Sequence, residues 1–145
     1  MQNKQKGQSI IEFALVLPLF LLLVFGLFYI GMFFADYLTL SSIARSSARE
    51  AAIISSDDYY KNNYKKIREK YKNEKLPMDI YQWDPKNKTN FDIEYKNNNV
   101  VVNMKANLNE NGIFLENIVN KLADSTKSNF DLHITYTMYS EYTQK

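Results

Sequence analysis

The chain has 145 residues, and its formal charge of +2 arises from 18 basic and 16 acidic residues. This length suffices for one modest domain and one membrane segment, but not for two independent cores. The lack of cysteine and the single histidine exclude disulfides, cysteine nucleophiles and multi-histidine metal sites. Because the basic residues are scattered between acidic ones, we expect no nucleic acid partner, and we also expect no cofactor and no enzymatic activity.

An uncharged apolar run occupies residues 13–35. As a helix rising about 1.5 Å per residue it would be roughly 34 Å long, enough to cross a bilayer core of about 30 Å. A cleavable secretory peptide has a shorter apolar region and a small residue three positions before its cut, whereas Phe33 would stand there in this chain. We therefore expect a single-pass transmembrane helix over residues 8–36 that ordinary signal peptidase does not remove.

Two basic residues, Lys4 and Lys6, precede this apolar run. Positive charge beside a membrane helix favours the cytoplasmic side, so the N-terminus is expected in the cytoplasm. Residues after Asp36 are then expected outside the cytoplasmic (inner) membrane.

A carboxylate, Glu12, stands directly before the apolar run, where an isolated charge costs a few kcal/mol. A cut after Gly7 would leave a new amino group at Gln8 and make Glu12 the fifth residue of the mature chain. A short basic leader ending in glycine, followed by glutamate at that place and an apolar helix, is the pattern of prepilin peptidase substrates. The alternative is an interfacial glutamate whose head lies in water.

The position of Glu12 has a physical explanation in a filament of bundled helices. The amine of one subunit and the carboxylate of another can neutralise each other in a dry core, and either charge alone would be penalised. We therefore assign processing to Gly7 and Gln8, and assembly and axial register to Glu12 and Phe13.

The residues that follow resemble a known family. The segment Glu12-Phe13-Ala14-Leu15-Val16-Leu17-Pro18 looks like the EFALxxP signature of TadE-like proteins, and the segment from Ile43 to Arg49 is similar to the AAREGAR segment of that family. The resemblance runs from Gly7 to about Ala52. It implies a minor pilin or pseudopilin of a tight-adherence, Flp-type (type IVb) pilus system, with a prepilin peptidase, other pilin subunits and the pilus assembly platform as partners.

Three positions depart from that family pattern: Tyr29 replaces a frequent acidic residue, Met32 a basic one and Ser47 a glycine. A major pilin of such a system is usually little more than its helix. The long C-terminal part of this chain therefore favours a minor subunit, which the resemblance allows to enter an extracellular pilus.

Five further residues of the helix give rise to predictions. Pro18 removes one backbone hydrogen bond and should bend the helix within the membrane. Gly26 and Gly31 indicate either ordinary tolerance of small residues in membrane helices or close helix packing in a filament. Arg45 and Arg49 lie one turn apart, as a solvated stripe or as inter-subunit contacts.

Beyond residue 56, the patterns predict a small α+β domain that resembles pilin architecture. A helix with an apolar stripe is expected from Asp57, and another at residues 113–127. Three alternating strands are expected around residues 91–96, 100–106 and 130–138, with a turn at residues 97–99. The predicted organisation is a leader at 1–7, a transmembrane helix at 8–36, its continuation at 37–56 and an exported α+β domain at 57–145.

Three segments resemble sites without having the expected partners. Residues 107–112 resemble half of a calcium loop, but Ile118 stands where the loop needs glutamate. His133 falls on the polar face of the last strand, and Asn87 begins a glycosylation sequon that we interpret as a loop. We expect no metal site.

Two functions remain open from the sequence. The first is the structural role of a processed pilin or pseudopilin in adhesion or secretion. The second is a membrane-anchored extracytoplasmic domain that binds a ligand or senses the envelope and never enters a filament. Gly7 and Glu12 discriminate between them, because an anchor needs neither.

Overall fold

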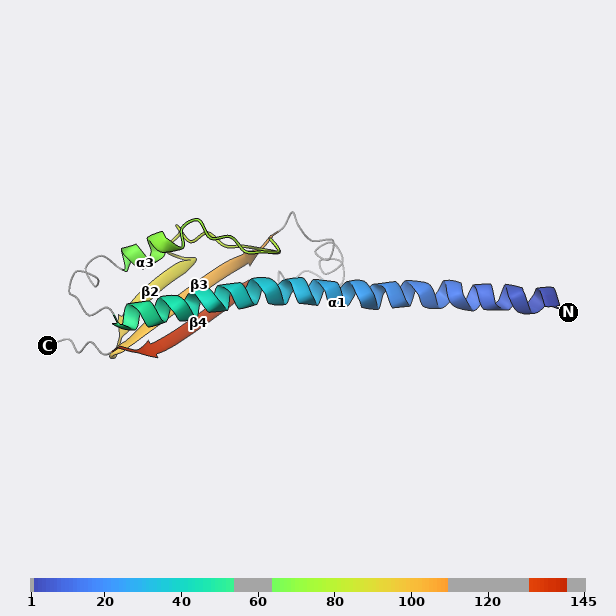
Figure 1. Cartoon of the computed structure of the whole chain (residues 1–145), viewed down its shortest axis with the longest axis horizontal. Helices are drawn as coiled ribbons and strands as arrows, with labels where there is room; N and C mark the ends of the chain where they lie inside the picture. The colour runs from blue at the N-terminus through green and yellow to red at the C-terminus, as the bar shows by residue number, and fades with distance from the viewer. Residues whose placement is uncertain (1, 54–63, 110–130, 141–145) are drawn as a thin grey trace, which may run out of the picture. The chain divides into compact units, whose positions relative to one another are not determined.

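The computed structural model describes residues 2–53, 64–109 and 131–140. The chain forms two compact units, Met1–Phe34 and Ala35–Lys145. The helices and strands, labelled in Figure 1, are α1 (Gln2–Ile53), α3 (Lys65–Lys70), β1 (Tyr81–Gln82), β2 (Phe91–Lys96), β3 (Asn99–Leu108) and β4 (Leu132–Tyr139).

The first unit consists of the N-terminal part of α1. Its apolar residues follow one another without helical periodicity, so no side of this helix is reserved for a protein core. The helix passes through Pro18 without ending.

The second unit contains an antiparallel sheet of four strands. Strand β3 is central, with β1 and β2 pairing along it and β4 pairing with it as well. Strands β2 and β3 form a hairpin through Asn97 and Asn98, whose φ angles of 53° and 60° are those of a tight turn with left-handed residues. The α+β fold class and this hairpin were both predicted and are confirmed. The predicted count of about three strands omitted β1, whose two residues are too few to show alternation.

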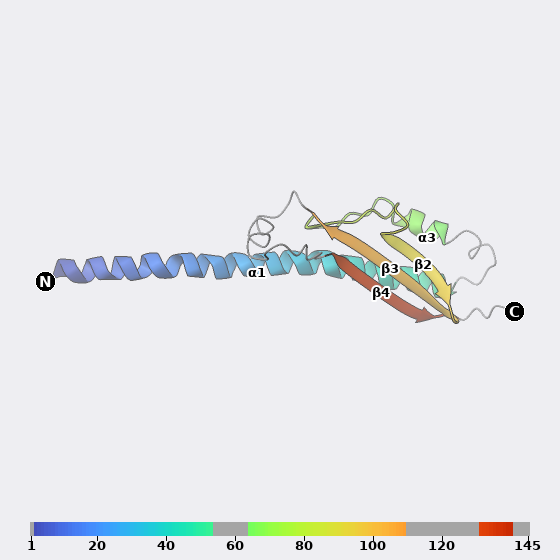
Figure 2. The same cartoon turned by 180° about the vertical axis from the view of Figure 1, so that it is seen from behind.

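One face of the sheet packs on the C-terminal part of α1 in the second unit (Figures 1 and 2). The buried helix residues recur every three or four positions, as packing on a flat sheet requires: Asp36, Leu40, Ile43, Ala44, Ser47, Ala48, Ala51 and Ala52. Alternate strand residues complete the core, among them Phe91, Val100, Val102 and Met104.

The start of the helix predicted from Asp57 lies outside the described residues. In the described part, α3 begins after Tyr64, whose φ of 51° is left-handed, so the predicted apolar stripe does not belong to one unbroken helix through this residue. Tyr64 and Ile67 are nonetheless buried, as the predicted apolar stripe requires. The helix predicted at residues 113–127 and the start of the last strand at Phe130 lie outside the described residues.

Candidate functional site: the N-terminal helix

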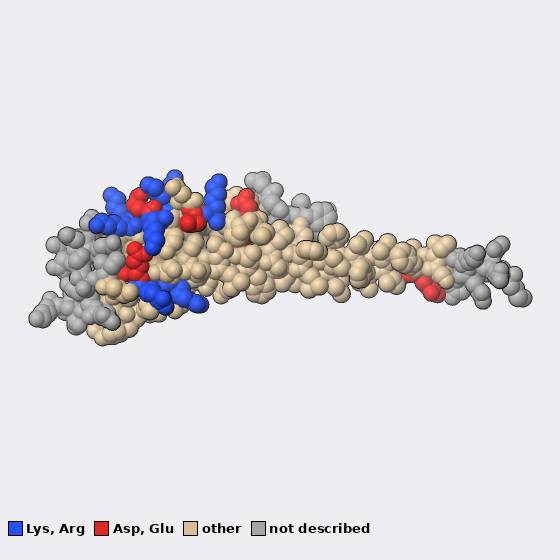
Figure 3. Space-filling model, in the orientation of Figure 1, with Lys and Arg blue, Asp and Glu red and all other residues tan. Residues whose placement is uncertain are grey.

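The helix α1 carries a long apolar surface that the described part of the chain does not cover. The stretch Ser9–Ile53 is long and apolar enough to cross a membrane. Large apolar side chains of the first unit are exposed, including Leu15 at 75% and Phe20 at 58% of their surface. Figure 3 shows the corresponding run of uncharged surface along the helix. Since apolar patches of this size are rare on soluble monomers, this surface needs lipid or other apolar helices around it.

The residues assigned to processing and register lie at the start of this surface. Gly7 and Gln8 are both within α1. Glu12 and Phe13 are exposed, with Glu12 the last charged residue before the apolar surface begins. A second molecule could therefore reach this carboxylate directly.

The two helix glycines have no packing role within the described chain. A Cβ atom built at Gly26 or at Gly31 meets nothing within 4 Å. Their small size is therefore not needed for contact with the described residues. The bend expected at Pro18 stays a prediction.

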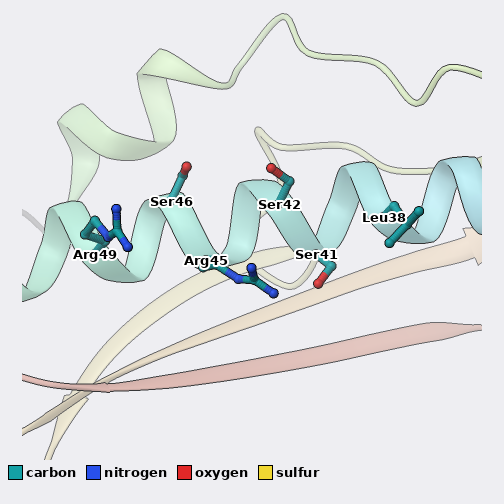
Figure 4. Close-up of a pocket in the computed structure, with 6 residues that line it drawn as sticks. All are labelled: Leu38, Ser41, Ser42, Arg45, Ser46 and Arg49. Atoms are coloured by element: carbon teal, nitrogen blue, oxygen red, sulfur yellow. The ribbon is translucent and has the colours of Figure 1, made fainter.

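The predicted arginines lie on the exposed side of α1 in the second unit. Arg45 and Arg49 line a shallow groove of about 280 Å³ together with Leu38, Ser41, Ser42 and Ser46. Figure 4 shows Arg45 and Ser41 pointing toward the side of the strands, whereas Ser42 and Ser46 point the other way. The Arg45 guanidinium lies 5.9 Å from the centre of the Tyr136 ring on β4, a cation–π distance. These two arginines are the only predicted site residues among the described ones that line a common groove.

A buried carboxylate that the sequence analysis did not single out organises the second unit. Asp36 is fully buried and accepts hydrogen bonds from the backbone N–H groups of Met78 at 2.9 Å, Ile80 at 3.0 Å and Tyr81 at 3.3 Å. A buried carboxylate is tolerated when several donors satisfy its oxygens. Asp36 therefore fastens the segment before β1 to α1. The available signal was its spacing of four residues from Leu40 and eight from Ala44, which places it on the core side of the helix.

The same segment is held from its other side by Asn109, in the part of the sequence that resembles half of a calcium loop. The Asn109 side chain donates to the Asp79 carbonyl at 2.9 Å and accepts from Gln82 at 2.9 Å. Its backbone N–H donates to the Ile80 carbonyl at 2.8 Å. Asn109 thus holds the chain where Asp79 takes a left-handed φ of 55°.

Burial raises the pKa of the Tyr81 phenol above its ordinary value, and the nearby Asp131 and Asp36 carboxylates raise it further.

One of the three departures from the family pattern lies in the core. Ser47 is fully buried, and its hydroxyl has no hydrogen-bond partner among the described residues. An unpaired buried hydroxyl costs free energy, and a glycine at this position would not incur that cost. No described contact compensates for it.

The predicted His133 is exposed on the outer face of β4, as expected for the polar side of that strand. Among the described residues, no group of three or more histidine, cysteine, aspartate or glutamate residues could hold a metal ion.

Comparison with known proteins gives one family match. Residues 7–49 match the family model described as TadE-like protein. No curated protein and no solved structure matches the chain. The match begins at the glycine that precedes the predicted cut and ends at Arg49, so it covers most of the predicted resemblance. Residues 7–49 are therefore similar to TadE-like proteins, which is consistent with a component of the tight-adherence pilus system.

Proposed function

We propose that this chain is a minor pilin or pseudopilin of a tight-adherence pilus or a related secretion apparatus, cleaved by a prepilin peptidase after Gly7. The observation that carries the proposal is the TadE-like match from residue 7 to residue 49, which includes Glu12 and the apolar run. Its role is structural and not catalytic. Its partners are the peptidase, other pilin subunits and the assembly platform.

The exposure of α1 supports this proposal. The most apolar stretch of α1 is not buried by the described residues, so it can move from lipid into a bundle of like helices without losing contacts to them. Gly26 and Gly31, which touch nothing within the described chain, would allow close approach in such a bundle. A membrane anchor outside any filament would also need the apolar surface, but it would give no reason for Gly7 or Glu12.

Glu12 is proposed to pair with the Gln8 amine of a neighbouring subunit. Within one helix, four residues separate the two groups by about 6 Å along the axis, so the carboxylate can reach the amine of its own helix as well as that of a neighbouring subunit, and the experiment below tests the intersubunit pair. The pair would neutralise two charges in a dry bundle and would fix the axial register.

The test is Glu12→Gln, which keeps the shape of the side chain and removes its charge. In cells with an active prepilin peptidase, intact-mass measurement should show Gln8 as the N-terminus of both the wild type and the variant. Co-purification of the variant with pilus subunits should fall at least about tenfold, as expected when a buried ion pair loses one partner. A retained leader in the wild type would overturn the processing step. Normal co-purification of a cleaved variant would leave Glu12 as an interfacial residue.

The proposed topology places residues after Asp36 outside the cytoplasmic membrane. Because the chain has no cysteine, Asn98→Cys supplies a single thiol at the turn between β2 and β3. A membrane-impermeant maleimide should label this thiol in intact cells. A matched Gln2→Cys variant in peptidase-negative cells should be labelled only after lysis, and the opposite pattern would reverse the topology.

A further inference from the structure

The two outer strands of the sheet differ in how well their free edges are protected. Soluble proteins usually guard an edge strand with charges, proline or a bulge, because unpaired backbone groups there accept strands from other chains. Strand β2 carries Asp92, Glu94 and Lys96, and the N–H of Phe91 already donates to the Asn87 carbonyl at 3.1 Å. Strand β4 has the sequence LHITYTMY, with no acidic or basic residue other than His133, no proline and no glycine.

The register shows which backbone groups of β4 are available. Ser140 N–H donates to the Asn98 carbonyl at 2.9 Å, so this residue faces β3. Backbone groups alternate in direction along a strand, and the pairing of β4 with β3 runs without a bulge. The even-numbered residues therefore bond to β3, and the N–H and C=O groups of His133, Thr135, Thr137 and Tyr139 point away from it. In the described part of the chain, no strand pairs with β4 on that side.

The side chains next to this edge also determine which side chains an added strand should carry. On the face toward α1, Leu132 and Ile134 are buried, but Tyr136 and Met138 are only half-buried. An additional strand beside β4 would place alternate side chains against these two residues. Apolar side chains at those positions would complete the cover of the sheet.

A charge beside the edge adds a second requirement. The Arg45 guanidinium lies over the Tyr136 ring, and among the described residues Arg45 takes part in no ion pair. A carboxylate on the α1-facing side of an added strand would find this guanidinium close to the half-buried part of β4. Arg49, one turn further along the same groove, adds to the positive potential.

We propose that the free edge of β4 binds an extended segment of a partner polypeptide that pairs with it as an additional strand. The segment has apolar side chains on its α1-facing side and one carboxylate among them that pairs with Arg45. This inference goes beyond the pilin assignment and does not depend on entry into a filament.

A second copy of β4 does not fit this site when both copies share one membrane. Figures 1 and 2 show β4 and the α1 residues of the second unit running toward the same end. Copies with their helices in the same direction would bring two β4 strands together in parallel. If a two-fold axis related the two copies, each residue of β4 would lie opposite the same residue of the second copy, and the two side chains would point to opposite faces of the sheet. Residues that lie opposite each other in a pleated sheet have their side chains on the same face, so this pairing is not allowed.

The test measures amide hydrogen exchange by NMR on the full chain in detergent micelles. The probe is a capped eight-residue peptide of alternating threonine and valine in which one central valine is replaced by glutamate. At saturation, the amides of Thr135 and Thr137 should exchange at least about tenfold more slowly, while the amides of Ile134 and Tyr136, already bonded to β3, should change little. A peptide N-methylated along its bonding edge should protect neither set.

Matched variants separate the backbone and charge contributions. Thr137→Pro removes one outward N–H without breaking a bond to β3 and should abolish the protection at Thr135, whereas Thr137→Ala keeps the N–H and should behave like the wild type. A lysine in place of the peptide glutamate should weaken binding several-fold, and Arg45→Gln should remove that difference. Equal binding of the two peptides would overturn the role of Arg45. Unchanged exchange with every peptide, or protection that grows with protein concentration alone, would overturn the partner strand.

Discussion

The two units treat the same kinds of residue in opposite ways. In the first unit Phe20 is 58% exposed, whereas in the second unit Phe91 is fully buried against Tyr71 and Trp83. Both are phenylalanines in regular secondary structure, so residue type does not explain the difference. The second unit folds by burying apolar surface within one chain, while the first unit leaves its apolar surface for lipid or for other helices. The apolar residues of the second unit therefore stabilise its own fold, whereas those of the first unit are available to contact lipid or other helices.

The largest expected effect comes from substituting these two phenylalanines in parallel. Phe91→Ala should lower the free energy of unfolding of the second unit by about 3–5 kcal/mol, because it leaves a cavity beside Trp83. Phe20→Ala should change that free energy by about 0.5 kcal/mol or less. Trp83, the single tryptophan, is buried in this core, so its fluorescence during urea unfolding in detergent reports on the second unit. Equal effects of the two substitutions would contradict the separation of roles.

Substitution of Asp36 should give the next largest loss of stability. This residue lies in the second unit, where it is buried and accepts three backbone hydrogen bonds. Asp36→Ala leaves the N–H groups of Met78, Ile80 and Tyr81 without their acceptor and should cost roughly 2–4 kcal/mol. Amide exchange at these three positions should accelerate. Glu94→Ala, which removes an exposed carboxylate of β2, is the matched control and should have little effect. Unchanged exchange at Ile80 in the Asp36 variant would refute the fastening role.

The smallest effect is expected at Ser47, and its sign is the informative part. Ser47→Ala removes a buried hydroxyl that has no partner among the described residues and should raise the free energy of unfolding by about 0.5–1 kcal/mol. Ser47→Gly also removes the hydroxyl but loses helix propensity of about 1 kcal/mol relative to alanine, so it should be less stable than the alanine variant. Urea unfolding followed by Trp83 fluorescence measures both. Destabilisation by Ser47→Ala would show that the hydroxyl has a partner under solution conditions.

The sequence by itself determined the features that depend on local order. Helix and strand periods are local properties, so several features could be recognised from the order of residues alone. They are the uncharged run of residues 13–35, the spacing of Gly7 and Glu12, and the alternation in β2, β3 and β4. The left-handed turn at Asn97 and Asn98 was predictable for the same reason, since asparagine tolerates that conformation. The α+β class followed from these patterns, and the residues from Glu12 to Pro18 carried the resemblance to TadE-like proteins.

Only the tertiary structure decided which distant residues meet. Asp36 was expected to be the last residue of the transmembrane helix, and packing buries it and gives it three backbone donors from residues 78–81. The pairing of β1 with the end of β3 depends on contacts between residues far apart in sequence, and two residues carry no periodic signal. The edge of β4 that no described strand covers likewise follows from the order of strands in the sheet and not from the composition of β4. Local propensity sets the type of each element, but burial and hydrogen bonding between distant segments determine which charges are enclosed and which edges remain free.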